Sequence, residues 1–447
     1  MTKIFLWFAL FFLAAFGAVL LADNPGAVTI DFQGLRFYSS FAELAAASMA
    51  LMLLAGAGVW LTGWLKRDMP VLGSNSVIKR QARGLKMLNQ SLVALSAGDH
   101  KLAARLVGQA EVLLPPQPMV HLIAAEAAQR GGDHAGAKKR YAALEDTTDG
   151  RLLGLRGLLA EARRSGRESE ALRLARAAFE ENRKSPWVLK TLFALEVAAG
   201  NWAEAESALA KVVREGLMEK EVSVRHQGAL AYAEAAEMLL KGNRAGARKE
   251  YKRALSLRTD FPPATVALAK LELADGQKKR AQKLVREAWR REPHPGLARI
   301  FKELDIAESK ADWLKRVKLL IESQPEHPNS LLLLVDALMD AGEYDAAKPV
   351  LEKLTREEPS REAWQFRLAL AHALGEDPDP IEAALAHAED GALWQCSECG
   401  SKPKGWSPLC PACDNFDTVE WLQKAETSRP ANTFDPDSTI ALIAETV

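Results

Sequence analysis

Two long apolar segments stand out near the start of the chain. Ile4 to Leu21 is an unbroken apolar run of eighteen residues, and Leu44 to Leu61 is a second one, interrupted only by Ser48. At 1.5 Å per residue, each run forms a helix about 27 Å long, close to the ~30 Å hydrocarbon core of a bilayer. Neither run has a polar face, which argues against a buried helix of a soluble protein. The pattern predicts a two-helix transmembrane hairpin over residues 1–66, with spans at about 4–21 and 44–61.

A cleaved signal peptide is the alternative for the first run. It has one preceding basic residue, Lys3, but its apolar stretch is longer than the usual 7–15 residues of a signal peptide core. The loop between the spans, residues 22–40, contains the alternating segment TIDFQGLRFYSS around Gly34. This alternation predicts a small β-hairpin at the membrane face.

The charges that flank the second run predict the orientation of the chain. Basic residues follow this span in excess over the single acid Asp68, whereas the loop between the spans has two acids and one base. Because basic flanks stay on the cytoplasmic side, we expect both termini in the cytoplasm and the loop outside, in a multi-pass membrane protein. The basic residues after the second span are Lys66, Arg67, Lys79, Arg80, Arg83 and Lys86.

A repeat of 34 residues organises most of the remaining chain. Glycines recur every 33 or 34 residues, apart from one step of 42 residues and one of 66, and an alanine follows seven of them by five residues. The glycines are Gly98, Gly132, Gly166, Gly200, Gly242, Gly276, Gly342 and Gly375, and the alanines are Ala103, Ala137, Ala171, Ala205, Ala247, Ala281 and Ala347. The pattern predicts helix–turn–helix units in which glycine ends the first helix and alanine allows the second to pack closely. Tyr141 and Tyr251 are expected to fill the space between helices.

This repeat resembles the tetratricopeptide repeat (TPR), which has the same period and layout. The segments AGEYDAAKPVLEKLTREEP and AGNWAEAESALAKVV match it best. After a linker over 67–79, we expect eight or nine units over residues 80–390, with an insertion near 215–227 and a degenerate repeat around 309–325. Such α-solenoids bind protein segments on their concave face, so the resemblance implies a protein partner in the TPR groove.

All four cysteines lie within eighteen residues near the C-terminus. Cys396, Cys399, Cys410 and Cys413 form the pattern C-x2-C-x10-C-x2-C, with Gly400 after the first pair. Two such turns provide four thiolates for one tetrahedral ion, as Zn²⁺ or a rubredoxin-type iron requires. The segment is too short to bury a core, so we expect the metal to fold it. The sequence predicts a rubredoxin-like or zinc-ribbon-like metal module over 391–423, with Zn²⁺ favoured over Fe, and a flexible tail over 424–447.

Composition and missing motifs narrow the function further. The 58 basic residues balance the 58 acidic ones, which argues against a nucleic-acid binder, and 48% hydrophobic residues argue against a disordered chain. The sequence has no phosphate-binding glycine loop, dinucleotide fingerprint, HExxH or GxSxG motif, so we expect no enzyme and no catalytic residues. The histidines are scattered and are interpreted as solvated or capping residues, and their spacing does not favour a haem or porphyrin ligand. They are His100, His121, His134, His226, His294, His327, His372 and His387.

Taken together, these parts resemble the proteobacterial HemY family, whose members join two N-terminal spans and a brief loop to cytoplasmic TPRs. The hairpin from Ile4 to Leu65 is the most specific part of the resemblance. The resemblance implies a scaffold at the bacterial inner membrane that acts in the late steps of haem (tetrapyrrole) synthesis and binds pathway enzymes or their intermediates. The chain lacks the flavin fingerprint of the protoporphyrinogen oxidases that share the family's name.

The cysteine segment itself resembles the C-terminal metal module of the LapB family of TPR proteins. WQCSECG and CPAC, separated by the ten-residue spacing, carry this resemblance. It implies an alternative function, a membrane adaptor that regulates lipopolysaccharide synthesis or delivers clients to a protease. Members of the LapB family have one span, whereas two are predicted here.

Overall fold

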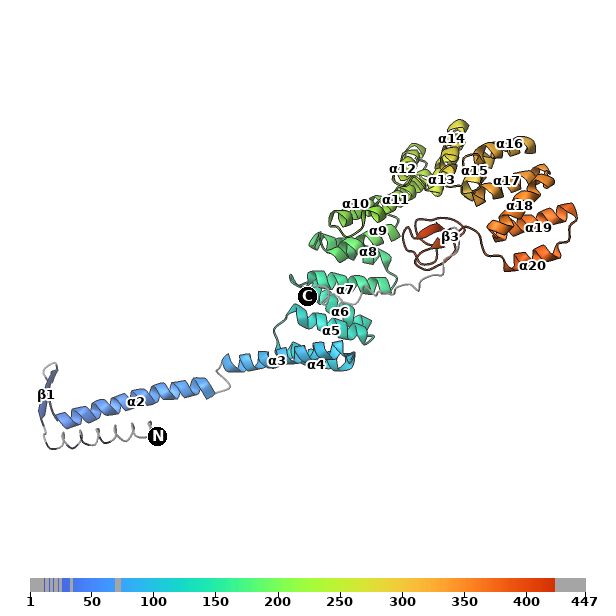
Figure 1. Ribbon diagram of the computed structural model, residues 1–447. Helices are drawn as coiled ribbons and strands as arrows, with labels where there is room; N and C mark the ends of the chain where they lie inside the picture. Colours follow the sequence, from blue (N-terminus) through green and yellow to red (C-terminus); the bar gives the residue numbers. More distant parts are fainter. Residues whose placement is uncertain are drawn as a thin grey trace. The chain divides into compact units, whose positions relative to one another are not determined.

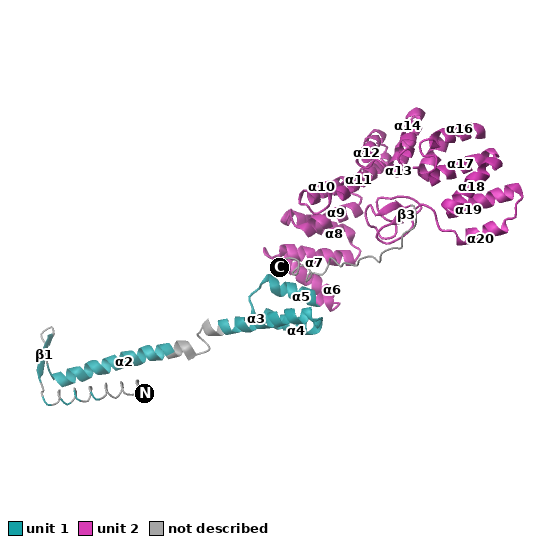
Figure 2. Ribbon diagram, in the orientation of Figure 1, with its two compact units in different colours: residues 1–127 teal, residues 128–447 magenta. Residues whose placement is uncertain are grey.

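The computed structural model describes residues 26–32, 35–68 and 74–422, together with the single residues 12, 16, 19 and 23. Two compact units divide it, residues 1–127 and 128–447 (Figure 2). The predicted first span and the predicted C-terminal tail lie outside the described residues, apart from the single residues of the span. Each unit is described here by itself.

A β-hairpin and one long apolar helix begin the first unit. Strands β1 (Ala27–Phe32) and β2 (Leu35–Ser40) pair antiparallel, which confirms the predicted hairpin. Helix α2 (Phe41–Asp68) follows directly, and its segment Phe41–Gly63 is long and apolar enough to cross a membrane. Ser40 and Glu43 form a reciprocal cap at its start: Ser40 Oγ accepts from the Glu43 backbone N–H (3.3 Å), and Glu43 Oε2 accepts from that of Ser40 (3.1 Å). One apolar helix of the described chain is therefore suited to membrane anchoring.

Paired helices make up the rest of the described chain except its C-terminal end (Figure 1). The first unit contains α3 (Ser74–Ser96), α4 (His100–Leu113) and most of α5 (Pro118–Arg130). The second unit contains α6 (His134–Glu145), α7 (Arg151–Arg164), α8 (Glu168–Glu181), α9 (Pro186–Ala198), α10 (Trp202–Arg214), α11 (Lys220–Leu240), α12 (Arg244–Leu257), α13 (Pro262–Ala274), α14 (Lys278–Trp289), α15 (Pro295–Glu303), α16 (Lys310–Ile321), α17 (Pro328–Ala341), α18 (Tyr344–Glu357), α19 (Arg361–Leu374) and α20 (Asp379–His387). The chain is a mostly helical TPR-like solenoid.

The turn glycines and the alanines that follow them have the predicted roles. All eight repeat glycines have a positive φ, between 66° and 83°, which L-residues with a side chain rarely adopt. Each of the seven alanines is 0% exposed, so the second helix of each pair lies close to its neighbours. Tyr141 is also fully buried, and a Cβ at Gly157 of α7 would lie 2.2 Å from its ring. The glycine at 157 therefore makes room for the tyrosine between the helices.

The eight extra residues between Gly200 and Gly242 lengthen one helix. Helix α11 has 21 residues, whereas the equivalent first helices α9 and α13 have 13 each. Because α11 and α13 both begin twenty residues after their preceding repeat glycine, the extra residues lie within α11. They extend it by about 12 Å, slightly more than two turns.

The predicted degenerate repeat is the pair α15 and α16. Helix α15 has only nine residues, and Ser309 caps α16 by accepting a hydrogen bond from the Asp312 N–H. Large aromatic side chains fill this part of the core, with Trp289, Phe301 and Trp313 each at most 3% exposed. The pair thus keeps the repeat's packing although its first helix is short and its glycine is missing.

A small two-stranded sheet closes the described chain. Strands β3 (Leu393–Cys396) and β4 (Val419–Leu422) pair antiparallel, with Cys396 opposite Val419. The 22 residues between the strands form loops that carry the remaining three cysteines.

Candidate metal centre

Two matching turns hold the four cysteines. In the first, the Gly400 N–H donates to the Cys396 carbonyl and the Cys396 N–H donates to the Ser401 carbonyl, each at 2.9 Å. The second turn has the same two hydrogen bonds fourteen residues later. The Asp414 N–H donates to the Cys410 carbonyl, and the Cys410 N–H donates to the Asn415 carbonyl, each at 2.9 Å. Gly400 and Asp414 both have positive φ, 70° and 55°. Gly400 is therefore the turn glycine of the first cysteine pair, and Asp414 takes the equivalent conformation in the second turn.

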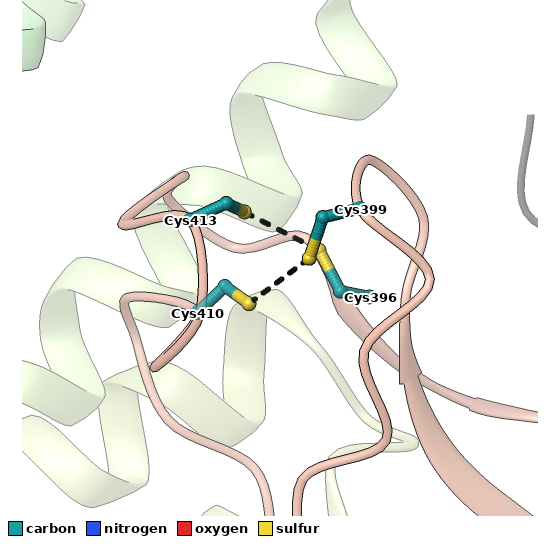
Figure 3. Close-up of side chains that lie close together, drawn as sticks. All are labelled: Cys396, Cys399, Cys410 and Cys413. Carbon is teal, nitrogen blue, oxygen red and sulfur yellow. Dashed lines mark hydrogen bonds between the residues drawn. The ribbon is translucent and has the colours of Figure 1, made fainter. Parts of the chain in front are cut away.

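The four sulfur atoms converge on one point (Figure 3). All four Sγ atoms lie within 4.8 Å of one another, with 3.8 Å from Cys396 to Cys413 and 3.7 Å from Cys399 to Cys410. Four thiolates at the usual Zn–S distance of ~2.3 Å around one ion lie about 3.8 Å apart. The spacing therefore fits a tetrahedral S4 ion, and it is the only such cluster of potential ligands within the described residues.

Hydrogen-bond donors surround these sulfurs. The Ser401 hydroxyl lies 3.2 Å from Cys399 Sγ and 3.3 Å from Cys410 Sγ, and Asn415 Nδ2 donates to Cys413 Sγ at 3.5 Å. Burial raises the pKa of Cys410, but the Ser401 hydroxyl and the backbone N–H groups of Ala412 and Cys413 outweigh it and lower this pKa to about 6. Burial and the neighbouring thiols raise the pKa of Cys413 to about 12. Donors of this kind stabilise thiolates in sulfur-ligated metal sites.

A buried carboxylate joins the cysteine module to the helices. Asp417 is 1% exposed and, like Asp414, has a positive φ (53°). Its carboxylate accepts hydrogen bonds from Arg225 Nε (3.3 Å) and Arg258 Nη1 (2.9 Å) and lies 3.1 Å from His226 Nδ1. Arg225 also donates to the Asp417 carbonyl at 2.7 Å and pairs with Glu420 of β4. The module is therefore held by α11 and by the residue that follows α12.

Glycine 228 and two aromatic rings complete this contact. A Cβ at Gly228 would lie 2.8 Å from Arg258 Cδ. Because glycine has no side chain, Arg258 can pass Gly228 closely and reach Asp417. Phe416 directly precedes Asp417 in the chain. Its ring centroid lies 5.8 Å from that of Phe193 of α9 and 5.3 Å from that of His226. Both are edge-to-face or tilted contacts of the kind that aromatic pairs prefer.

The three tryptophans that frame the cysteines all pack toward the helices. Trp406 lies edge-on to Tyr232 and Phe261, with centroid distances of 4.9 and 4.7 Å. Trp394 and Trp421 lie 5.2 Å apart, and both contact the ring of His294, which is 6% exposed. Burial and the nearby charge of Arg299 lower the pKa of His294 to about 4.

The cysteine spacing predicts that the four thiols meet at one point, but it does not predict the contacts that hold the module against the helices. The sequence does not point to Arg225, Arg258 or Asp417, because 159 to 192 residues separate the partners in the chain. The interpretation of His226 as a solvated or capping residue is wrong, since its largely buried ring faces the Asp417 carboxylate. The longer repeat between Gly200 and Gly242 is the one sequence signal, since the residues that it adds belong to the helix that carries Arg225 and His226. His294 and His327 cap helices, as interpreted from the sequence, through Nδ1 atoms that accept from the Gly296 and Asn329 N–H groups.

Known proteins resemble parts of this chain. The family model "HemY protein N-terminus" matches residues 26–132, and a tetratricopeptide-repeat model matches residues 314–370. "Protein HemY" of Escherichia coli (strain K12) is 30% identical over 148 residues, which are 31% of this chain and 35% of that protein. "Probable magnetosome protein Mms48" of Magnetospirillum gryphiswaldense is 23% identical over 279 residues, 57% of this chain and 58% of that protein. The chain thus spans between a third and somewhat more than half of these curated relatives.

Two solved structures are also similar to this chain, each with a TM-score below 0.5. The alignment with the structure of Naa15/Naa10 bound to HypK-THB has a TM-score of 0.38 and 14% sequence identity. It covers 68% of this chain and 49% of that chain. The alignment with yeast Tom70 has a TM-score of 0.28 and 15% sequence identity, and it covers 68% of this chain and 84% of that chain.

Proposed function

We propose that this chain, a distant homologue of E. coli HemY that joins a HemY N-terminal domain to tetratricopeptide repeats, is a membrane-anchored scaffold in haem biosynthesis. Its role is to bind pathway enzymes or their intermediates on the cytoplasmic side of the inner membrane. The observation that carries the proposal is the HemY N-terminal match, which extends from the β-hairpin through α2 and the first repeat helices.

Two spans and a cytoplasmic array are part of this proposal. The apolar run from Ile4 to Leu21 supplies the first span and α2 the second, with the β-hairpin between them outside the cytoplasm. The basic residues that follow α2, against one acid, support this orientation because basic flanks remain on the cytoplasmic side. The repeats, and with them the metal module, are then accessible to cytoplasmic enzymes.

The four cysteines hold Zn²⁺, or iron, in a rubredoxin-like centre. The sulfur spacing and the surrounding N–H and hydroxyl groups support this assignment. Four thiolates leave no open coordination position, so the ion's part is to fold the module and the scaffold's role is non-catalytic. The folded module then presents Asp417 and Phe416 to α11 and α9.

Loss of the protein tests the haem role. We expect a strain without this chain to accumulate porphyrins, measured by their fluorescence in cell extracts, and to recover on expression of the full chain. Crosslinking from the native membrane followed by mass spectrometry should then identify enzymes of tetrapyrrole synthesis next to the repeats. Normal porphyrin and haem levels in the strain would contradict the proposal.

A LapB-like adaptor is the second candidate, and the cysteine module favours it. In that function the chain regulates lipopolysaccharide synthesis or delivers clients to a protease. Normal porphyrins together with altered lipopolysaccharide in the same strain would support the adaptor over the haem scaffold.

A further inference from the structure

A cavity of about 510 Å³ lies between the cysteine module and helices α11, α13, α15 and α19. Tyr232 and three indole rings line it on the aromatic side, with contributions from α13 and α15. The indoles belong to Trp394, Trp406 and Trp421, all from the cysteine module. Its volume is within the range of ~300–1,000 Å³ that is typical of small-molecule sites. The module and the helices thus each provide part of its wall.

Positive charge surrounds this aromatic cavity. Lys270 of α13, Arg299 of α15 and Lys404 of the module are exposed lining residues, and none forms an ion pair or hydrogen bond within the described part of the chain. Glu362 is the one carboxylate among the lining residues, and burial together with the charge of Asp390 raises its pKa. Three exposed cations therefore outnumber the one acid among the lining residues, which favours an anionic occupant.

Unsatisfied polar atoms gather in the walls of the same cavity. The Nε1 atoms of Trp406 and Trp421 and the Nε2 atom of His294 are buried and have no hydrogen-bond partner among the described residues. Because His294 Nδ1 accepts from the Gly296 N–H, the neutral ring carries its proton on Nε2, so all three are donors. Leaving a buried donor without an acceptor destabilises the folded chain.

We propose that this cavity binds a planar aromatic carboxylic acid, with its rings against the indoles and its carboxylate toward Lys270, Arg299 and Lys404. The aromatic walls offer stacking and edge-to-face contacts to a flat ring system. The cations at the rim favour a carboxylate over a neutral group of the same shape. The scaffold role alone does not require such a site.

The site exists only while the cysteine module is folded against the helices, and to that extent it rests on the proposed metal centre. Asp417 and Trp406 hold the module in place, and Trp406 also lines the cavity. Metal loading and ligand binding are therefore coupled: an ion that folds the module also completes the cavity.

Calorimetric titration of the metal-loaded full chain in lipid nanodiscs tests the site, with 2-naphthoate as the probe and 2-naphthamide as its uncharged match. We expect 2-naphthoate to bind at least ten-fold more tightly than the amide. The double variant Arg299→Gln/Lys404→Gln should lose this preference, because it removes two rim charges without touching the core. Lys283→Gln, which removes an exposed cation of α14, should leave it unchanged.

The outcomes separate the site from the scaffold role. Absence of 2-naphthoate binding, equal affinity for the amide, or a preference that survives in the double variant would overturn the proposal. Removal of the metal should abolish binding, and undiminished binding to metal-free protein would show that the module does not build the site. Porphyrin levels and crosslinked partners are measured independently, so either proposal can fail while the other stands.

Discussion

Arg258 and Asp417 form a buried ion pair across 159 residues of the chain, with 2.9 Å between Arg258 Nη1 and Asp417 Oδ1. The pair joins the residue after α12 to a loop of the cysteine module, and the carboxylate is 1% exposed. Arg225 and His226 face the same carboxylate from α11. Asp417 is thus the point at which the repeats hold the module.

Asp417→Asn should release the module from the helices without removing its metal. Loss of one charge from a buried, hydrogen-bonded pair at an interface costs about 2–5 kcal/mol. We expect faster protease cleavage between residues 388 and 422 and an unchanged metal content. Asp390→Asn is the matched control, because Asp390 is half-exposed and pairs with Arg361 and Lys402 at the surface. Equal protease resistance in the two variants would contradict the role of Asp417.

Gly157→Ala should destabilise the repeats, because the added Cβ would lie 2.2 Å from the Tyr141 ring. Overpacking of this kind costs about 1–3 kcal/mol and should lower the melting temperature in circular dichroism. Gly108→Ala of α4 is the control, since no atom lies within 4 Å of its Cβ position. That substitution should be neutral or stabilising by up to about 1 kcal/mol, because alanine favours helix over glycine. The same melting temperature shift in both variants would argue against the close contact.

Stability should fall with decreasing pH partly because of His294. Burial and Arg299 lower its pKa to about 4 in the folded chain, against about 6.5 when it is unfolded. Below pH 6.5 the unfolded chain therefore binds a proton that the folded chain does not, and folding loses up to about 3 kcal/mol by pH 4. His294→Asn keeps a capping side chain but does not titrate, so its urea unfolding curves should show a smaller loss over this pH range. Parallel losses in the two proteins would exclude His294 as the cause.

Reporter fusions test the proposed topology. β-Galactosidase fused after Val447 should be active, and alkaline phosphatase at the same position inactive, because the proposed topology puts the repeats in the cytoplasm. Alkaline phosphatase inserted after Gly34, in the loop between the spans, should be active. Active alkaline phosphatase after Val447 would overturn the orientation drawn from the basic flank of α2.

Local sequence patterns predicted much of this fold because short-range physics controls them. The turns between helices require a positive φ, which glycine adopts readily, and the alanines allow close contact between helices. The 34-residue period of these two residue types therefore predicts where each helix pair lies in the chain. The cysteine spacing likewise contains the complete ligand set within two turns.

Contacts between distant segments could not be predicted in the same way. Asp417 resembles any loop aspartate until the longer helix α11 brings Arg225 to it, and Asp414 shows no sequence sign of its positive φ. The aromatic cavity also depends on where the module packs, since Trp406 and Trp421 meet Tyr232 and His294 only in the folded chain.

Metal analysis of the purified full chain tests most directly the claim that one ion folds the C-terminal module onto the repeats. We expect one zinc or iron per chain by elemental analysis, with X-ray absorption showing four sulfur ligands at about 2.3 Å. Cys396→Ser/Cys399→Ser should lose this metal and expose the module to protease. A full-length chain that has no metal but a protease-resistant module, or an ion with nitrogen or oxygen ligands, would contradict the account.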